Sequence, residues 1–211
     1  MTELVFILDR SGSMYGLEQD TIGGFNSLLE KQKADSGEAF VTTVLFDHHI
    51  RFLHDRQPLQ EVNPMTGADY TIGGSTALLD AVGSTIQHIA RIHKYAHPDH
   101  KPHKTLFVII TDGLENASRE FTSDKVMALI THEQEKYGWE FLFLGANIDA
   151  VSEGARFGIA PERAVTYKCD REGTALNYEV LSEAVTNVRA CRPMSANWSA
   201  RIQADVNKRG R

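Results

Sequence analysis

The sequence predicts an α/β fold in which helices cover both faces of a mostly parallel sheet, a three-layer α/β/α sandwich. Short apolar runs alternate along the chain with longer segments whose apolar residues recur at helical spacing. Two of the runs, 4–8 and 106–110, are apolar throughout, which is typical of strands buried on both faces. One pair of strand-like segments is too close in sequence for a parallel crossover, so one strand should be antiparallel.

The first strand is expected at 4–8 in the middle of the sheet, and an amphipathic helix follows it up to residue 34. Residues 40–46 are rich in β-branched and aromatic types and predict a second strand, and 50–53 predict a third. Only the polar interval 47–49 separates these two strands. A parallel pair needs a crossover of about a dozen residues. The two should therefore form a hairpin, with the later strand antiparallel at the edge of the sheet.

After an irregular segment, the rest of the chain alternates helix and strand. The expected elements are helix 78–92, strand 106–110, helix 126–137, strand 141–144, a short helix between 149 and 158, strand 164–167 and helix 176–188. Thr122 or Ser123 is the expected N-cap of helix 126–137, and Asp149 is that of the short helix. Gly23 and Gly24, inside the first helix, suggest close packing against the sheet.

Composition narrows the class of protein. The 211 residues are 42% hydrophobic and 24% charged, as in an ordinary soluble globular protein. The net charge of −6 argues against general affinity for nucleic acid, because binding to phosphates needs a basic surface. No apolar stretch reaches the roughly 18 to 20 residues that cross a bilayer, so no membrane insertion is expected. Residues 1–3 form no positively charged leader, so a cytoplasmic location is expected, with Cys169 and Cys191 as reduced thiols.

One domain is expected over residues 1–191, followed by a basic tail over 192–211. The apolar periodicity ends at Arg192, and Trp198 and Ile202 are the large apolar residues of the tail. The tail is predicted to be loosely ordered by default, with docking on the body through Trp198 or binding to a partner as the alternatives.

Oxygen-bearing side chains follow the two apolar strands and open one helix. The segment 9–13 reads Asp-Arg-Ser-Gly-Ser, Thr76 stands just before helix 78–92, and Asp112 follows strand 106–110. Ligands gather at the carboxyl ends of strands in sheets of this kind. Carboxylate and hydroxyl oxygens are hard donors, which select Mg²⁺, Ca²⁺ or Mn²⁺ over zinc or copper. The sequence therefore predicts a divalent cation site formed by five residues: Asp9, Ser11, Ser13, Thr76 and Asp112.

This arrangement resembles the von Willebrand factor A (vWA) domain family, over roughly residues 2–190. The metal-ion-dependent adhesion site (MIDAS) of that family combines a first-loop D-x-S-x-S with a distant threonine and a distant aspartate. The resemblance implies a Rossmann-like vWA fold of the intracellular, single-domain bacterial or phage type. It also implies that the bound ion is Mg²⁺ or Mn²⁺ and that Ser11, Ser13 and Thr76 bind it directly. Asp9 and Asp112 would bind directly or through water.

The function implied by the resemblance is that of a binding or scaffold module and not an enzyme. A partner protein would present an Asp or Glu side chain to the open coordination position of the metal. Asp80, in the first turn of helix 78–92, is expected to interact favourably with the helix dipole and not to contact the metal. Arg10 is expected to face solvent.

Two other functions remain open. A Mg²⁺-dependent phosphoryl-transfer or hydrolytic enzyme also holds its ion at the ends of parallel strands. Against it, no second aspartate stands two residues after Asp9, and the sequence has no Gly-rich phosphate loop ending in Lys-Ser or Lys-Thr. The other alternative is a structural subunit that the metal stabilises and whose site meets no partner.

Four histidines fall close together before strand 106–110, namely His93, His97, His100 and His103. Pro98 and Pro102 interrupt this segment, and no acidic or cysteine ligand completes a known metal pattern. A solvated loop is expected here in preference to a metal site.

Overall fold

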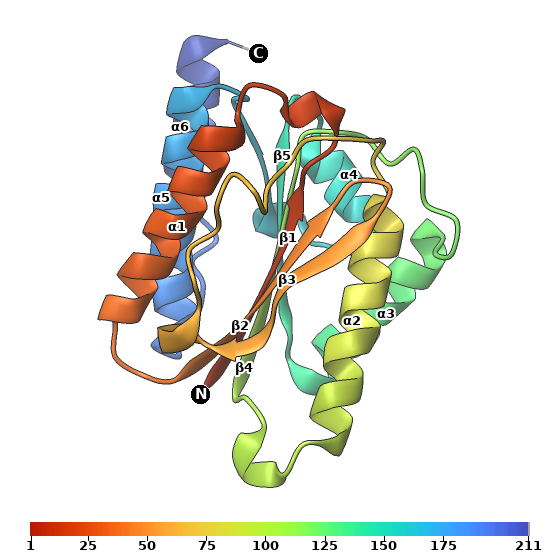
Figure 1. Ribbon diagram of the computed structural model, residues 1–211, viewed down its shortest axis with the longest axis vertical. Coiled ribbons are helices and arrows are strands. Elements are labelled where there is room, and N and C mark those ends of the chain that lie inside the picture. The colour runs from red at the N-terminus through yellow and green to blue at the C-terminus, as the bar shows by residue number, and fades with distance from the viewer. Residues whose placement is uncertain (211) are drawn as a thin grey trace.

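β1 (Thr2–Asp9) runs through the middle of a six-stranded sheet, with parallel strands β2 (Ala39–Phe46) and β4 (Lys104–Thr111) on its two sides. Figure 1 shows this computed structural model, which describes residues 1–210. The strand order is β3-β2-β1-β4-β5-β6. β5 (Glu140–Ala146) and β6 (Ala164–Tyr167) continue the parallel part, whereas β3 (Ile50–Pro58) pairs with β2 in antiparallel orientation at the other edge. The predicted three-layer sandwich with one antiparallel edge strand is confirmed.

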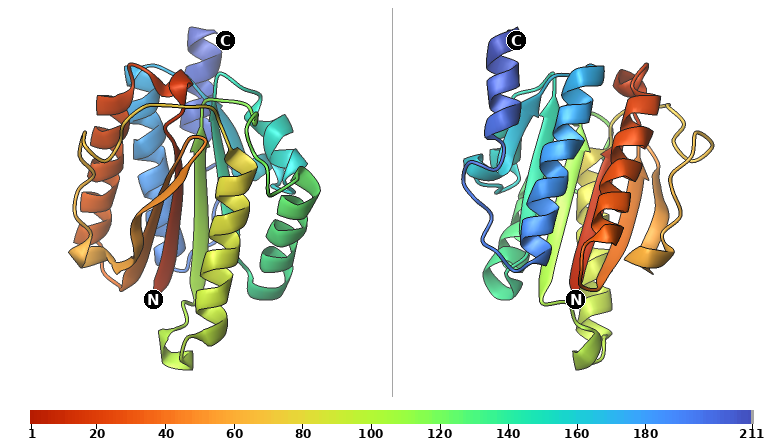
Figure 2. Two further views of the ribbon diagram at one scale, coloured as in Figure 1. Left: turned by 45° about the vertical axis from the view of Figure 1, so that its right-hand side comes forward. Right: turned by 90° about the vertical axis from the view of Figure 1, so that its left-hand side faces the viewer.

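Two layers of helices cover the sheet because successive side chains of a strand point to opposite faces. Leu4, Phe6 and Leu8 face the layer of α1 (Glu18–Ala34) and α5 (Arg171–Arg189). Val5 and Ile7 face the layer of α2 (Leu78–Tyr95), α3 (Ser123–Tyr137) and α4 (Ala150–Arg156). Figure 2 shows the two layers on either side of the sheet. β1 is thus buried on both faces, as its apolar run indicates.

The structure extends two elements beyond their predicted lengths. β3 continues to Pro58, whereas the sequence predicts a strand that ends at residue 53. α5 begins at Arg171, five residues before the first apolar position of the predicted helix, and Asp170 caps it by accepting a hydrogen bond from the Gly173 N–H. The predicted caps Thr122 and Asp149 also accept hydrogen bonds from backbone N–H groups in the first turns of α3 and α4. In the described part of the chain, no helix is both long and apolar enough to cross a membrane.

The C-terminal segment packs on the body of the protein. It contains a helix that the sequence does not predict, α6 (Ala200–Arg209), whose Ile202 is buried in the hydrophobic core that includes residues of α1 and α5. The Trp198 ring N–H donates to the Glu162 carbonyl at 2.8 Å, and Arg201 pairs with carboxylates of α5. Arg211 lies outside the described residues. The division into a domain of 1–191 and a tail of 192–211 stays a prediction.

Gly24 allows α1 and α5 to approach closely. A Cβ atom at Gly24 would lie 2.3 Å from a ring carbon of Tyr178, a buried residue of α5. The close contact is therefore with a helix and not, as the sequence suggests, with the sheet. A Cβ atom at Gly23 would meet no heavy atom within 4 Å. Only Gly24 of the pair is required by packing.

Gly24→Ala is expected to lower the free energy of unfolding by about 1–3 kcal/mol, because the added methyl group overpacks the contact with Tyr178. Gly23→Ala is the matched control. It places the same methyl group in open space and is expected to raise the free energy of unfolding by about 0.5–1 kcal/mol through helix propensity. Guanidinium denaturation of both variants checks the pair. Equal effects of the two substitutions would contradict the packing argument.

Candidate metal centre

Three loops meet at the carboxyl ends of β1 and β4, at the upper end of the sheet in Figure 1. After β1 the chain crosses through α1 to β2 on one side, and β4 pairs on the other side. The strand order therefore reverses between β1 and β4, and such a switch point is where open α/β sheets bind ligands. Asp9 ends β1, Asp112 directly follows β4, and Thr76 stands two residues before α2.

Asp9 is held rigidly at the end of β1. Its side chain is buried, with only 1% of the residue exposed. One carboxylate oxygen accepts a hydrogen bond from the Ser11 backbone N–H at 2.7 Å, and the other accepts one from the Thr111 hydroxyl at 2.6 Å. The Asp9 carbonyl accepts a hydrogen bond from the Tyr70 hydroxyl. These contacts fix the carboxylate before any ligand arrives.

The serine hydroxyls link Asp9 to Asp112. The Ser11 and Ser13 hydroxyl oxygens lie 3.1 Å apart, and the Ser13 hydroxyl donates a hydrogen bond to Oδ1 of Asp112. A Cβ atom at Gly113 would lie 2.8 Å from the Thr76 hydroxyl oxygen and 3.4 Å from that of Ser13. The structure thus brings together all the side chains that the sequence predicts as ligands.

The segment after Asp112 supports Thr76 and the start of α2, a role that the sequence does not predict. The Asn116 side-chain oxygen accepts a hydrogen bond from the Thr76 N–H at 2.9 Å, and the Asn116 N–H donates to the Thr76 carbonyl at 3.0 Å. The Glu115 carboxylate accepts hydrogen bonds from the Leu79 N–H and from the Ser118 N–H and hydroxyl. The only sequence signal is a cluster of polar residues after a strand, which also describes an ordinary turn.

Asp80 has a role in addition to the expected one. Its carboxylate accepts hydrogen bonds of 2.8–2.9 Å from three successive backbone N–H groups, those of Arg119, Glu120 and Phe121. Asp80 lies in the first turn of α2, as predicted, and it also ties that turn to the segment that precedes α3. Asp80 therefore positions the loops around the candidate metal centre.

Arg10 does not face solvent as expected. Its guanidinium lies 3.4 Å from Oδ2 of Asp47, in a pair whose side chains are both mostly buried. No lysine or arginine forms an ion pair with Asp9 or Asp112 in the part of the chain that the structure describes. Among the described residues, the two carboxylates of the centre thus have no paired lysine or arginine.

The electrostatics of the centre favour a bound cation. Burial raises the pKa of Asp9 above its usual range, against the hydrogen bonds from Thr111 and Ser11, which lower it. Burial also raises the pKa of Asp112 to about 6, and the charge of Asp9 adds to that rise. Buried charges in proteins are normally paired or bind metals. A divalent ion would balance the two carboxylates.

The donor set fits a hard cation. Carboxylate and hydroxyl oxygens suit Mg²⁺, Ca²⁺ and Mn²⁺. The Cys169 sulfur lies 3.9 Å from Oδ2 of Asp112, which the sequence analysis did not foresee. Burial, together with the charge of Asp112, raises the pKa of the Cys169 thiol to about 11. The thiolate is the form that binds soft metals, so this neutral thiol does not change the preference. Cys169 and Cys191 are both free, as expected.

The histidine-rich segment does not form one cluster. His93 lies on α2, where its ring nitrogen is 3.2 Å from the buried carboxylate of Glu3 and its ring contacts Trp139. His97 and His100 lie on an exposed single turn, with ring centroids 6.2 Å apart. Within residues 1–210, none of these histidines belongs to a group of three metal-ligating side chains that converge.

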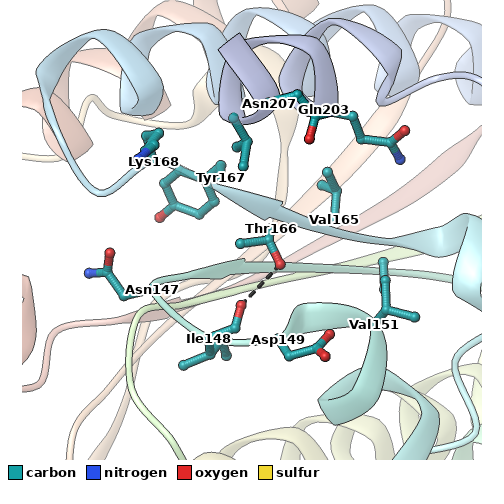
Figure 3. Close-up of a pocket in the computed structure, with 12 residues that line it drawn as sticks. Asn147, Ile148, Asp149, Val151, Val165, Thr166, Tyr167, Lys168, Gln203 and Asn207 are labelled. Atoms are coloured by element: carbon teal, nitrogen blue, oxygen red, sulfur yellow. Dashed lines mark hydrogen bonds between the residues drawn. The ribbon is translucent and has the colours of Figure 1, made fainter. Parts of the chain in front are cut away.

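A separate cavity of about 620 Å³ lies between α4, β6 and α6 (Figure 3). Gln203 and Asn207 of α6 line one side, and Asn147 lies on the opposite side. The hydroxyl of Thr166 donates a hydrogen bond to the carbonyl of Ile148 at 3.0 Å, and both residues line the cavity. The five predicted ligands are not among its lining residues, so this cavity is distinct from the candidate metal centre.

No family model matches the sequence, and no curated protein matches it. Solved structures match the fold. Proximal thread matrix protein 1 from the mussel byssus, in a structure with a zinc-occupied MIDAS motif, superposes with a TM-score of 0.60 at 16% identity, covering 88% of this chain and 46% of that one. The ArnB paralog VWA2 from Sulfolobus acidocaldarius superposes with a TM-score of 0.54 at 16% identity, covering 87% and 44%.

A von Willebrand factor type A structure from Catenulispora acidiphila superposes with a TM-score of 0.56 at 14% identity, covering 88% of this chain and 42% of that one. The chain therefore has the vWA fold. It spans less than half the length of each of these three structures.

Proposed function

From the vWA fold and the geometry of the candidate metal centre, we propose that this chain is a metal-dependent protein-binding module. A divalent cation, Mg²⁺ in the first instance, is held by Asp9, Ser11, Ser13, Thr76 and Asp112. The observation that carries the proposal is the convergence of three hydroxyl side chains on two buried carboxylates, with which no lysine or arginine pairs among residues 1–210. The zinc-occupied MIDAS motif of the mussel protein supports metal binding at such a site.

In this proposal the hydroxyls of Ser11, Ser13 and Thr76 bind the ion directly, and Asp9 and Asp112 bind directly or through water. Hydroxyl ligands leave the ion strongly electrophilic. An Asp or Glu side chain of a partner protein then completes the coordination. Mg²⁺ and Mn²⁺ both accept carboxylate oxygens in this way.

The surface beside the centre also supports a protein partner. Tyr15 and Leu114 each stand two residues beyond a predicted ligand, and they are 82% and 54% exposed. Tyrosine is enriched among the contacts that dominate protein interfaces, and Leu114 adds apolar surface that a partner can cover. We place the partner over the metal, with these two side chains in the contact.

Calorimetric titration with Mg²⁺ and Mn²⁺ tests the metal site. The parent is expected to bind one ion, and Asp9→Ala and Thr76→Ala are expected to keep the fold and weaken binding by at least about tenfold, because each removes an oxygen ligand. Ser27→Ala removes an exposed hydroxyl of α1 and is expected to bind like the parent. Parental affinity in both centre variants would overturn the assignment of the site.

Capture from a cell lysate tests the partner. Retention in Mg²⁺, release by chelator and loss in Thr76→Ala together are the expected results. A protein retained equally in Mg²⁺ and chelator would favour a structural role for the metal. Turnover of generic phosphatase or nuclease substrates that Thr76→Ala abolishes would favour an enzyme over the proposed module.

A further inference from the structure

The turn between β2 and β3 carries a second group of metal-ligating side chains: Asp47, His48 and His49, here called the turn cluster. One ligand atom of each side chain lies within 4.8 Å of those of the other two. Within residues 1–210, this is the one group of three His, Cys, Asp or Glu side chains that meets this criterion. None of its members belongs to the candidate metal centre. In the sequence alone these residues are only a short polar interval between two strands.

Both imidazoles converge on one carboxylate oxygen. Nδ1 of His48 lies 3.4 Å from Oδ1 of Asp47, and Nδ1 of His49 lies 3.6 Å from the same oxygen. The two ring centroids are 3.9 Å apart. Around a zinc ion with bonds of about 2.0–2.1 Å, tetrahedral angles place neighbouring ligand atoms about 3.3 Å apart. Both nitrogen–oxygen distances are therefore close to the distance between neighbouring ligands of a bound ion, and the three ligand atoms all lie within 4.8 Å of one another.

Asp47 is fixed from several directions. Its Oδ2 lies 3.4 Å from the guanidinium of Arg10, which leaves Oδ1 directed to the histidines. Oδ1 also accepts the backbone N–H of His49 at 2.6 Å, and the Asp47 carbonyl accepts the Ala77 N–H at 2.9 Å. The carboxylate is buried, whereas the side chains of His48 and His49 are 48% and 71% exposed. An ion could thus enter from solvent and keep water in its remaining positions.

We propose that Asp47, His48 and His49 form a second metal site, which binds a borderline divalent cation such as Zn²⁺, Ni²⁺ or Cu²⁺. Two imidazole nitrogens and one carboxylate oxygen suit these ions, whereas Mg²⁺ and Ca²⁺ prefer oxygen ligands alone. Three protein ligands with open positions also match the ligand number of zinc sites that exchange their fourth ligand. By ligand type, the turn cluster therefore favours borderline ions, whereas the candidate metal centre favours hard ones.

The two sites share a loop. A Cβ atom at Gly74 would lie 1.9 Å from Nδ1 of His48, so the ring packs directly over this glycine. The Gly74 carbonyl accepts the Gly12 N–H of the loop that follows Asp9. The second site thus lies beside the first, yet it uses none of the same side chains. The proposal does not depend on the proposed function.

The test uses the full chain with excess Mg²⁺ present, titrated with Zn²⁺ by calorimetry and with Cu²⁺ by electron paramagnetic resonance. The parent is expected to bind one Cu²⁺ tightly with nitrogen hyperfine structure, which oxygen ligands do not give. His48→Gln/His49→Gln removes both imidazoles. Removing a group that only supports a metal ligand lowers metal affinity by about 10- to 100-fold. This double variant removes two ligands, so its Zn²⁺ affinity is expected to fall by at least about 100-fold. The nitrogen hyperfine structure should be lost as well.

His97→Gln/His100→Gln is the matched control, because it removes two exposed histidines that also lie near each other. It is expected to retain the Zn²⁺ affinity and the nitrogen signal of the parent. Equal binding by the parent and by His48→Gln/His49→Gln, or equal losses in both double variants, would overturn the proposal. The Mg²⁺ affinity of His48→Gln/His49→Gln should be parental, which keeps a failure of this proposal separate from a failure of the first site.

Discussion

The Asp112→Asn variant is expected to be more stable than the parent in chelator and less stable than the parent in saturating Mg²⁺. In chelator, the parent holds two buried carboxylates that no lysine or arginine pairs within residues 1–210. Burial and the charge of Asp9 raise the pKa of Asp112 to about 6, so at pH 7.5 the group is ionised at a cost. Asparagine removes the charge and keeps an oxygen that can accept the hydrogen bond from Ser13.

The expected sizes follow from the same charges. A rise of about two pKa units corresponds to about 3 kcal/mol, and solvent screening near the surface reduces this to about 1–2 kcal/mol of stability gained by the variant in chelator. In Mg²⁺ at 100 times the dissociation constant, the parent gains about 2.7 kcal/mol. The variant lacks one carboxylate and loses most of that gain, so the order of stabilities reverses.

Guanidinium denaturation at pH 7.5, in chelator and in Mg²⁺, measures this reversal. Glu135→Gln is the control for net charge, because Glu135 is exposed on α3, and it should shift neither condition. An Asp112→Asn variant that differs from the parent by the same amount in both conditions would mean that Mg²⁺ does not bind at this carboxylate.

The central part of the fold could be predicted from local patterns. The continuous apolar runs of β1 and β4 specify strands buried on both faces, and the three-residue interval 47–49 permits only a hairpin. The ends of these strands also indicated where Asp9 and Asp112 would meet. Each of these inferences needs only neighbouring residues and the geometry of a sheet.

The missed elements have weak local patterns. The second half of β3, residues 54–57, is polar because it lies at the edge of the sheet, so neither apolar alternation nor a β-branched run marks it. α6 buries Ile202 but is otherwise mostly polar, and its position depends on contacts with α5. Asp80 and Glu115 bind backbone N–H groups about 35–40 residues away, which only the folded loops bring close.

The position of Cys169 beside Asp112 could not be predicted from the sequence either. It lies 57 positions from Asp112 in the chain, after β6, and two strand crossovers separate them. The oxygen ligands could be proposed because their spacing matches a known pattern. The groups that surround them follow no pattern of spacing, because each is placed by a different loop.

Gly113→Ala is expected to weaken Mg²⁺ binding by about 10- to 100-fold and to leave the fold intact. The added Cβ atom would lie 2.8 Å from the Thr76 hydroxyl oxygen and 3.6 Å from the Thr76 methyl carbon. Hydrogen bonds with Asn116 fix the Thr76 backbone, and its β-branched side chain has few rotamers. The hydroxyl must therefore turn away from Ser13 and the carboxylates, which removes one ligand without changing any ligand residue.

A second substitution separates this steric effect from general damage to the loop. Thr76→Ser keeps the hydroxyl and removes the methyl group, so alone it should bind Mg²⁺ almost like the parent. Combined with Gly113→Ala, it frees the hydroxyl to rotate past the new methyl group, and part of the lost affinity should return. Gly67→Ala adds a methyl group in open space and should have no effect. Calorimetry measures the Mg²⁺ affinity of the four variants. If Gly113→Ala lowers the affinity equally with threonine and with serine at position 76, the position of this hydroxyl does not control the metal site.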